Sequence, residues 1–300
     1  MKVFYFYDKN FKPLRDRVVE SLEEIDDGFV TDEFFLEDLG VMPNRAGGGL
    51  PTYLLKAAKI KESLDKVEDG EVYLFTDVDI QFLKPCRHLF LETMNTEPKA
   101  DVAFQREFND IGVNIGVIAI RKTEATMKFW AEVLREIETT QQLDQRVVNN
   151  LLYSERATKE FGVVWRRLPE PIWASSMAFS GPPPAGFVLH HANFTSEKAA
   201  SSDPSIKLDQ MADFKKFSRG ENLEKLAEFV KDVQEHPTML NYRERHFGAM
   251  RPGPEWSLLE TDHVARPGGK AKTLKKARER AEKEKENLAE VGQDTTVTAA

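Results

Sequence analysis

Short apolar runs alternate with longer amphipathic segments over most of the chain. Short runs rich in β-branched and aromatic residues are typical of strands, whereas apolar residues three or four positions apart are typical of helices. One predicted strand is the apolar run that begins at Val72 and ends at Asp77. The other predicted strands are residues 3–7, 29–36, 101–104, 113–120, 163–168 and 187–190.

Amphipathic segments lie between these strands and predict helices at residues 14–25, 53–67, 123–137 and 145–153. The second helix follows Pro51, at a place where a first helical turn tolerates proline. Because strands and helices alternate, the pattern predicts an α/β fold. We expect a mixed, mostly parallel sheet flanked by crossover helices.

The pattern changes after the last predicted strand. Apolar residues at helical spacing between positions 223 and 233 predict a helix. The end of the chain is rich in charge and nearly free of bulky apolar residues, so it cannot form a core. We predict a domain of residues 1–205, a helical extension of residues 206–265 packed on it, and a solvated or flexible tail of residues 266–300. A basic interaction arm is the alternative for the tail.

Composition and charge narrow the class of protein. The chain has 41% hydrophobic and 31% charged residues, as ordinary globular proteins do, and a formal net charge of −8. That charge argues against general affinity for nucleic acid or anionic lipid. The single cysteine, Cys86, excludes an internal disulfide and fits a reducing compartment. No apolar run is long enough for a membrane span or a signal peptide, so we expect a cytoplasmic protein.

Two acidic side chains, Asp77 and Asp79, follow the strand that begins at Val72. Open α/β sheets bind ligands at the carboxyl ends of their strands, and these carboxylates are expected there. Two ionised carboxylates repel each other, so a site that holds both usually has a cation between them. The pair therefore suggests a metal ion that clamps a phosphate. The alternative without a function is that both residues are exposed carboxylates in a turn.

Two kinds of chemistry use such a pair at a strand end. In haloacid-dehalogenase-type phosphatases the first Asp attacks phosphate, but their motif normally continues to Thr or Val where this chain has Gln81. Their nucleophile strand also usually opens the domain, whereas here it lies well inside the chain. The second chemistry is transfer of a sugar from a nucleotide.

Further motifs resemble the second class. Residues DIGVNIGVIAIRKT (110–123) look like the N-x-G strand that follows the D-x-D pair in retaining glycosyltransferases of the GT-A fold. LDQRVVNNLL (143–152) resembles their D-Q-x-x-x-N element, and VLHHAN (188–193) resembles their late H-A-N element. In order and spacing the set is similar to the nucleotide-diphospho-sugar transferase family, which includes plant cell-wall xylosyl- and galactosyltransferases. The resemblance implies a GT-A, Rossmann-like fold.

The resemblance also implies a metal site. Asp79 would coordinate Mn²⁺, or Mg²⁺, directly, and Asp77 would ligate the metal or hold the ribose of the donor. His191 would be the third ligand because it heads the H-A-N triplet, although His190 competes for this role. Adjacent residues on a strand point to opposite faces, so at most one of these histidines faces the metal.

The remaining implied roles surround the donor. Asn114 and Asp144 would bind sugar hydroxyls, and Gln145 would lie near the anomeric carbon. Lys198 would reach the diphosphate, and Tyr7 from the first strand would stack on a uracil ring. Simpler roles stay open: Asn114 would close a turn before Gly116, and Asp144 would be a helix N-cap.

Four further residues are secondary candidates. Lys56 and Arg106 are possible phosphate or sugar contacts, although solvated surface positions are the more ordinary interpretation. Trp165 and Trp173 are candidates for an acceptor subsite, although Trp is usually part of the core.

The sequence thus favours a metal-dependent glycosyltransferase that moves a sugar from a nucleoside-diphosphate sugar, by resemblance a UDP-sugar, to a hydroxyl of a glycan or glycoconjugate with retention. One alternative is a metal-dependent phosphohydrolase or nucleotidyltransferase that uses the same acidic pair. The other is a non-catalytic binding protein on a GT-A-like scaffold. Neither the sugar nor the acceptor follows from the motifs.

Overall fold

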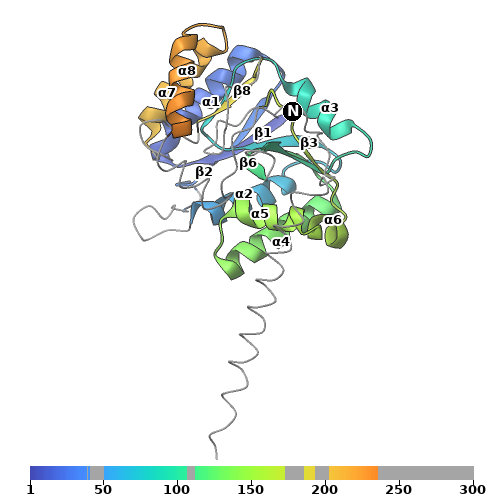
Figure 1. Ribbon diagram of the computed structural model, residues 1–300. Coiled ribbons are helices and arrows are strands. Elements are labelled where there is room, and N and C mark those ends of the chain that lie inside the picture. The colour runs from blue at the N-terminus through green and yellow to red at the C-terminus, as the bar shows by residue number, and fades with distance from the viewer. Residues whose placement is uncertain (39, 41–50, 107–111, 173–185, 193–202, 236–300) are drawn as a thin grey trace, which may run out of the picture. The chain divides into compact units, whose positions relative to one another are not determined.

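A six-stranded mixed sheet with the order β2-β1-β3-β6-β5-β7 forms the centre of the fold (Figure 1). The structure is a computed structural model that describes residues 1–38, 40, 51–106, 112–172, 186–192 and 203–235. The strands are β1 (Lys2–Tyr7), β2 (Val30–Phe35), β3 (Val72–Thr76), β5 (Val102–Arg106), β6 (Val113–Arg121) and β7 (Trp165–Arg167). A second, two-stranded sheet pairs β4 (Ile80–Phe82) with β8 (Leu189–His191).

The directions of the strands confirm a mixed, mostly parallel sheet. β1 is parallel to β2 and β3, and β5 is parallel to β7, whereas β6 runs antiparallel to both β3 and β5. The exception has a simple cause. β6 begins only a few residues after β5 ends, and a parallel connection needs a crossover of about a dozen residues or more.

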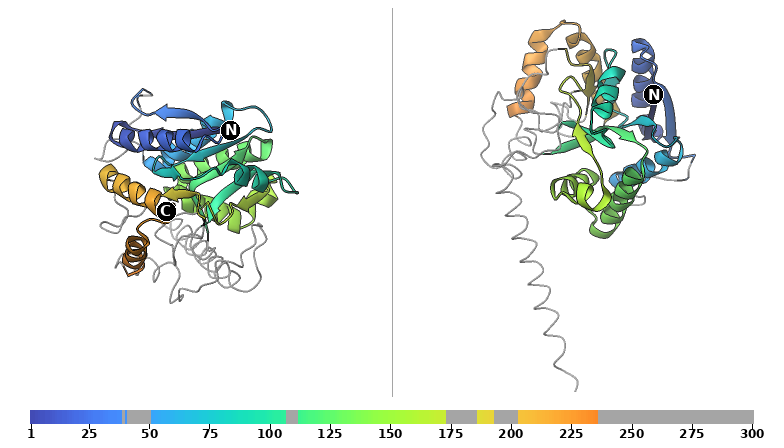
Figure 2. Two further views of the ribbon diagram at one scale, coloured as in Figure 1. Left: turned by 90° about the horizontal axis from the view of Figure 1, so that it is seen from above. Right: turned by 90° about the vertical axis from the view of Figure 1, so that its right-hand side faces the viewer.

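Helices cover both faces of the sheet (Figures 1 and 2). One face carries α2, α4, α5 and α6, and the other carries α1, α3 and α7. The helices are α1 (Lys12–Ile25), α2 (Thr52–Asp65), α3 (Arg87–Asn95), α4 (Glu124–Thr140), α5 (Asp144–Tyr153), α6 (Arg156–Phe161), α7 (Pro204–Phe217) and α8 (Leu223–Glu235), with a 3-10 turn, η1 (Lys9–Phe11), before α1.

The alternation of side chains along the strands divides the core into two layers. In β1, Phe4 packs with α2 and α4 on one side, whereas Val3 and Tyr5 pack with α1 and α3 on the other. In β3, Phe75 packs in the same layer as Phe4, and Leu74 packs in the same layer as Val3 and Tyr5. Because both faces of these strands are buried, the strands read as continuous apolar runs.

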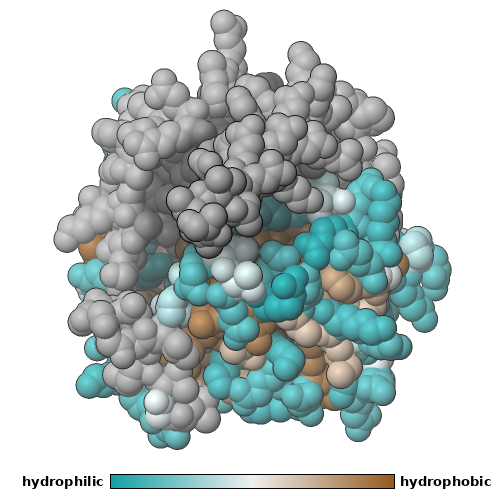
Figure 3. Space-filling model, turned by 90° about the horizontal axis from the view of Figure 1, so that it is seen from below, coloured by the Kyte–Doolittle hydropathy of each residue, from teal (hydrophilic) through white to brown (hydrophobic). Residues whose placement is uncertain are grey.

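The outer surface of the helices is mostly polar. On the face shown in Figure 3, hydrophilic side chains of the described residues predominate and apolar ones are interspersed among them. Among the described residues, none of the helices combines the length and the apolar character that a bilayer crossing needs.

The predicted helices and strands are present, with boundaries that differ by a few residues. Pro51 lies just before α2, at its N-cap, and not in its first turn. The short helices α3 and α6 were not predicted, because each offers only a few apolar positions to define a period.

Candidate functional site

The acidic pair lies where β3 leaves the main sheet. The backbone N–H of Asp77 donates to the carbonyl of Gly116 in β6 (2.8 Å), which holds the first carboxylate against the sheet edge. β4 begins directly after Asp79. Asp79 is buried, whereas the Asp77 side chain is 29% exposed.

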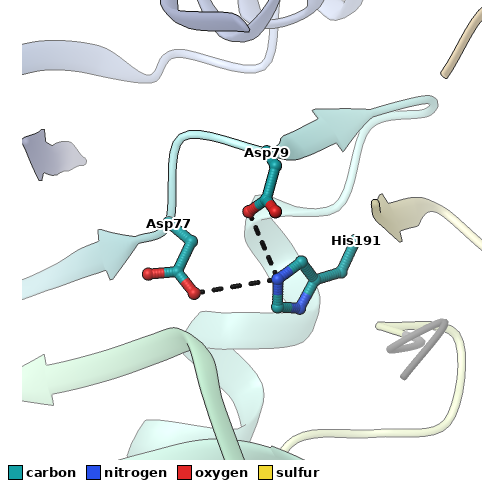
Figure 4. A group of neighbouring side chains, drawn as sticks. All are labelled: Asp77, Asp79 and His191. Carbon is teal, nitrogen blue, oxygen red and sulfur yellow. Dashed lines mark ion pairs between the residues drawn. The ribbon is translucent and has the colours of Figure 1, made fainter. Parts of the chain in front are cut away.

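Pairing between β4 and β8 brings a histidine to the two carboxylates. The antiparallel register sets His191 opposite Ile80. The Nε2 atom of His191 then lies 3.3 Å from Oδ1 of Asp79 and 3.7 Å from Oδ2 of Asp77 (Figure 4). Three ligand-type atoms from two distant segments therefore converge on one point.

His190 points the other way, as expected for adjacent residues on a strand. Its ring stacks on Phe214 of α7, with ring centroids 3.6 Å apart, and its Nε2 lies 3.1 Å from the amide nitrogen of Gln210. Burial, together with the neighbouring His191, holds the pKa of His190 well below its usual value, so this ring stays neutral. The structure places His191, and not His190, beside the carboxylates.

Gly116 makes room for the His191 ring. A Cβ atom at this position would overlap the His191 side chain and would lie 2.9 Å from Oδ1 of Asn114. The glycine of the N-x-G pattern therefore has a steric reason that the sequence pattern alone did not reveal.

Each carboxylate of the pair also contacts a lysine. Nζ of Lys56 lies 2.5 Å from Oδ1 of Asp77, and Nζ of Lys207 contacts Oδ2 of Asp79. Both lysines are buried, at 6% and 7% exposure. The expectation that Lys56 is a solvated surface residue was wrong, because α2 turns this side chain inward toward the end of β3.

The environment of Asp79 favours its ionised form. Burial by itself would raise the pKa of this carboxyl group, but the neighbouring Lys207 and His191 outweigh burial and hold the pKa well below its ordinary range. A carboxylate that stays ionised is the form that a metal ion needs.

The D-Q-x-x-x-N element is held against β6 by its last residue. Oδ1 of Asn149 accepts from the Val113 N–H (2.7 Å), and its Nδ2 donates to the Val113 carbonyl (2.9 Å). One turn earlier on α5, Oε1 of Gln145 accepts from the Ile115 N–H (3.4 Å). These contacts place the start of α5 beside the N-x-G strand, where Oδ1 of Asn114 accepts from the Gly116 N–H (2.7 Å).

Asp144 is the first residue of α5, and Leu143 occupies the N-cap position, so the N-cap prediction for Asp144 was wrong by one residue. Its Oδ1 accepts from the N–H of Gln145 at 2.8 Å. Burial raises the pKa of Asp144 to about 6, although Lys56 and a backbone N–H favour the charged form. A carboxyl group next to Asp77 with a pKa near neutrality is typical of a functional site.

These groups line one cavity of about 430 Å³, a volume in the range of small-molecule sites. The polar residues of its lining include Asp77, Asp79 and His191 with the three residues of the N-x-G and D-Q elements, namely Asn114, Asp144 and Gln145. The aromatic and aliphatic residues of its lining include Phe6, Tyr7, Phe11, Leu36 and Tyr53.

Tyr7 lines this cavity from the end of β1. Its hydroxyl donates to Oε1 of Glu33 on the neighbouring strand (3.0 Å), which fixes the direction of the ring. Arg15 also donates to Glu33 (2.7 Å) and stabilises its charge. The ring of Tyr7 is thus a preorganised flat surface in the lining of the cavity.

The other candidates have different outcomes. Lys198 and Trp173 lie outside the described residues. Trp165 is a core residue that packs edge-to-face on Tyr153, with ring centroids 5.6 Å apart. Arg106 is half-buried, donates to the Leu168 carbonyl (3.1 Å) and is not among the described residues that line the cavity. Lys207 has no signal in the sequence, because it matches no motif and follows the last predicted strand.

The convergent atoms fit a divalent cation. One ligand atom each from Asp77, Asp79 and His191 lies within 4.8 Å of the other two. Two carboxylate oxygens and one imidazole nitrogen form a donor set that can hold a divalent cation. Three protein ligands leave further coordination positions for a substrate.

Comparison with known sequence families gives one match, which covers residues 54–196 and is described as nucleotide-diphospho-sugar transferase. Over this segment, the chain is similar to the nucleotide-diphospho-sugar transferase family. The matched segment contains Asp77, Asp79, Asn114, Asp144 and His191. The comparison with curated proteins found no match.

Solved structures similar to this chain include glycosyltransferases with low sequence identity. GlyE of Streptococcus pneumoniae TIGR4 is 13% identical, with a TM-score of 0.48, over 70% of this chain and 59% of that one. This chain therefore spans less than two thirds of the GlyE chain. A glycosyltransferase involved in glycosylation of the major capsid of PBCV-1 is 12% identical, with a TM-score of 0.48, over 70% and 98%. Mouse xyloside xylosyltransferase 1 is 10% identical, with a TM-score of 0.42, over 64% and 97%.

Proposed function

We propose that this protein transfers a sugar from a nucleoside-diphosphate sugar to a hydroxyl group of a glycan or glycoconjugate. One observation carries the proposal. The Asp77, Asp79 and His191 ligand set lines the same cavity as Asn114, Asp144 and Gln145. All six residues lie in the segment that matches the nucleotide-diphospho-sugar transferase family.

Asp77, Asp79 and His191 would hold Mn²⁺ or Mg²⁺ in this reaction. Such a cation acts as a Lewis acid that stabilises the negative charge developing on the leaving diphosphate. In that role His191 would ligate the cation through a neutral imidazole nitrogen. The ionised Asp79 supplies a carboxylate oxygen without a cost of deprotonation near neutral pH.

The cavity suggests how the donor lies. The polar residues of its lining would accept the diphosphate and the sugar, and the aromatic residues would accept the nucleobase, for which Tyr7 offers a stacking surface. UDP is the nucleotide that we propose, from the family resemblance. Lys198 remains our candidate for a further contact to the diphosphate.

The start of α5 faces the reacting centre in this arrangement. In the transition state the anomeric carbon gains oxocarbenium character, and an ionised carboxylate nearby stabilises that positive charge. Asp144 is such a group above its pKa of about 6, and it also accepts hydrogen bonds from sugar hydroxyls. Gln145, next along the helix, would lie near the anomeric carbon, and Asn114 would orient a hydroxyl.

We also propose retention of the anomeric configuration, because the D-Q-x-x-x-N and H-A-N elements resemble those of retaining enzymes. NMR of the anomeric proton of the product at early times tests this. An inverted product would contradict it.

The central test is calorimetric titration with UDP in the presence of Mn²⁺, on the wild type and on Asp79→Ala. We expect binding by the wild type and a loss of affinity of at least about tenfold in the variant, as for loss of a charged metal ligand. A wild type that binds no nucleotide would remove the proposal. Release of free phosphate from the donor, instead of UDP, would favour the phosphohydrolase alternative.

The division of the chain at residue 205 remains a prediction. The site itself extends beyond this boundary, because Lys207 in α7 contacts Asp79. Residues after the family match therefore contribute to the chemistry that we propose.

A further inference from the structure

Helix α7 brings a buried cation into the site from outside the family match. Lys207 lies in the first turns of α7, and its ammonium group contacts Oδ2 of Asp79, a residue 128 positions earlier in the chain. The segment that matches the family ends at residue 196. Lys207 therefore comes from a part of the chain that carries no motif, whereas its partner Asp79 belongs to the D-x-D pair.

Other contacts hold α7 in place independently of Lys207. On β8, His190 stacks on Phe214 and lies within hydrogen-bond distance of Gln210. Two turns after Lys207, the ammonium group of Lys215 lies 2.5 Å from Oε1 of Glu24 on α1. Met211 belongs to a small buried cluster with Leu14 and Ala192. Loss of the Lys207 charge therefore leaves the docking of the helix largely intact.

In both Asp77 and Asp79, the two oxygens of the carboxylate face different partners. Oδ1 of Asp79 and Oδ2 of Asp77 face Nε2 of His191, whereas the second oxygen of each carboxylate contacts a lysine. In both residues one oxygen is thus turned toward the shared point and the other is held away from it. The lysines Lys207 and Lys56 therefore restrict the rotation of the ligands.

We propose that Lys207 is a positioning residue that sets the charge balance of this site, weakening the binding of the divalent cation and strengthening the binding of the diphosphate. The inference rests on the function proposed above. Two carboxylates and two ammonium groups cancel, and a histidine that ligates a metal is neutral, so the five side chains around a bound cation carry no net charge of their own. A bound divalent cation then leaves two positive charges, which match the two negative charges of the diphosphate in a nucleotide sugar.

Removal of the Lys207 charge changes the two affinities in opposite directions. A cation loses a repelling neighbour and gains an unpaired oxygen on Asp79, whereas an anion meets one positive charge less. Even at a dielectric constant close to that of water, a unit charge about 6 Å from a divalent ion changes its affinity by about tenfold. A purely structural role for Lys207 predicts instead that both affinities fall together.

The test uses the full chain and two neutral variants, Lys207→Met and Lys207→Gln. Binding of Mn²⁺ alone is measured by electron paramagnetic resonance of the free ion, and binding of UDP is measured by calorimetry at saturating Mn²⁺. Lys215→Met is the matched control, because it removes a lysine from the same helix without touching the cavity. Circular dichroism checks that each variant is folded, and the Gln variant carries the test if the Met variant is not.

We expect Mn²⁺ to bind about tenfold more tightly to the Lys207 variants than to the wild type, UDP to bind more weakly, and the Lys215 control to change neither. Mn²⁺ binding that is unchanged or weaker in a folded Lys207 variant would overturn this inference but leave the proposed function standing. A wild type that binds no Mn²⁺ would overturn both.

Discussion

Asp144 offers a sharp test of the electrostatics of the cavity. Burial raises the pKa of this carboxyl group from 3.8 to about 6, so the folded protein holds the ionised form at a cost. The replacement Asp144→Asn keeps the shape of the side chain and removes the charge. We expect the variant to be more stable than the wild type at neutral pH and to have lost sugar transfer.

The direction in which stability changes with pH follows from the number of protons bound in the folded and unfolded states. Between pH 3.8 and about 6 the unfolded chain releases the proton of Asp144 while the folded chain keeps it, so stability falls as the pH rises through this window. The shift of about 2 pH units corresponds to roughly 3 kcal/mol once both states are ionised. The loss of stability caused by the Asp144 charge already reaches about 1.6 kcal/mol at pH 5, and it is close to its full value at pH 7.5.

Urea unfolding of the two proteins at pH 5.0 and pH 7.5, in EDTA, measures this effect. The free-energy difference between variant and wild type should grow by about 1.4 kcal/mol between the two pH values in favour of the variant. The control is Asp69→Asn, because the Asp69 side chain is 93% exposed, and its effect should stay within about 0.5 kcal/mol at both pH values. A difference for Asp144→Asn that stays constant or shrinks toward pH 7.5 would refute the reasoning.

Three further changes probe the packing around the site. Gly116→Ala adds a methyl group that overlaps the His191 ring, so Mn²⁺ affinity measured by calorimetry should fall at least about tenfold; an unchanged affinity would contradict the steric role of the glycine. Asn149→Leu removes both bonds to Val113 and should cost about 1–3 kcal/mol in urea unfolding, with a parallel loss of UDP binding; a variant as stable as the wild type would show that these bonds are dispensable. Lys56→Met removes the ion pair with Asp77 and should lower the unfolding free energy in EDTA by about 1–3 kcal/mol. Saturating Mn²⁺ should restore most of this loss, because the bound cation neutralises the same carboxylate. No recovery with Mn²⁺ would show that Asp77 does not bind the cation.

Local patterns were sufficient for most of the fold. The apolar run of β3 and the four-residue spacing in α4 each lie within one short segment, so each element is encoded by residues close together in the chain. The Asp77 and Asp79 pair, and the order of the motifs after it, likewise required no knowledge of distant contacts. The reversed direction of β6 and the position of Leu143 at the N-cap of α5 were not predicted, because both depend on how neighbouring segments connect.

The sequence by itself determined the class of the fold and the chemistry of the ligands, since residue types and their spacing are local properties. Only the tertiary structure decided which groups meet. The register of β4 and β8 places His191, and not His190, beside the two carboxylates. Lys56 and Lys207 are buried in contact with the same carboxylates. The Lys207 contact joins residues 128 positions apart. No local pattern encodes such a pair, because it exists only when separate segments pack around a common buried charge.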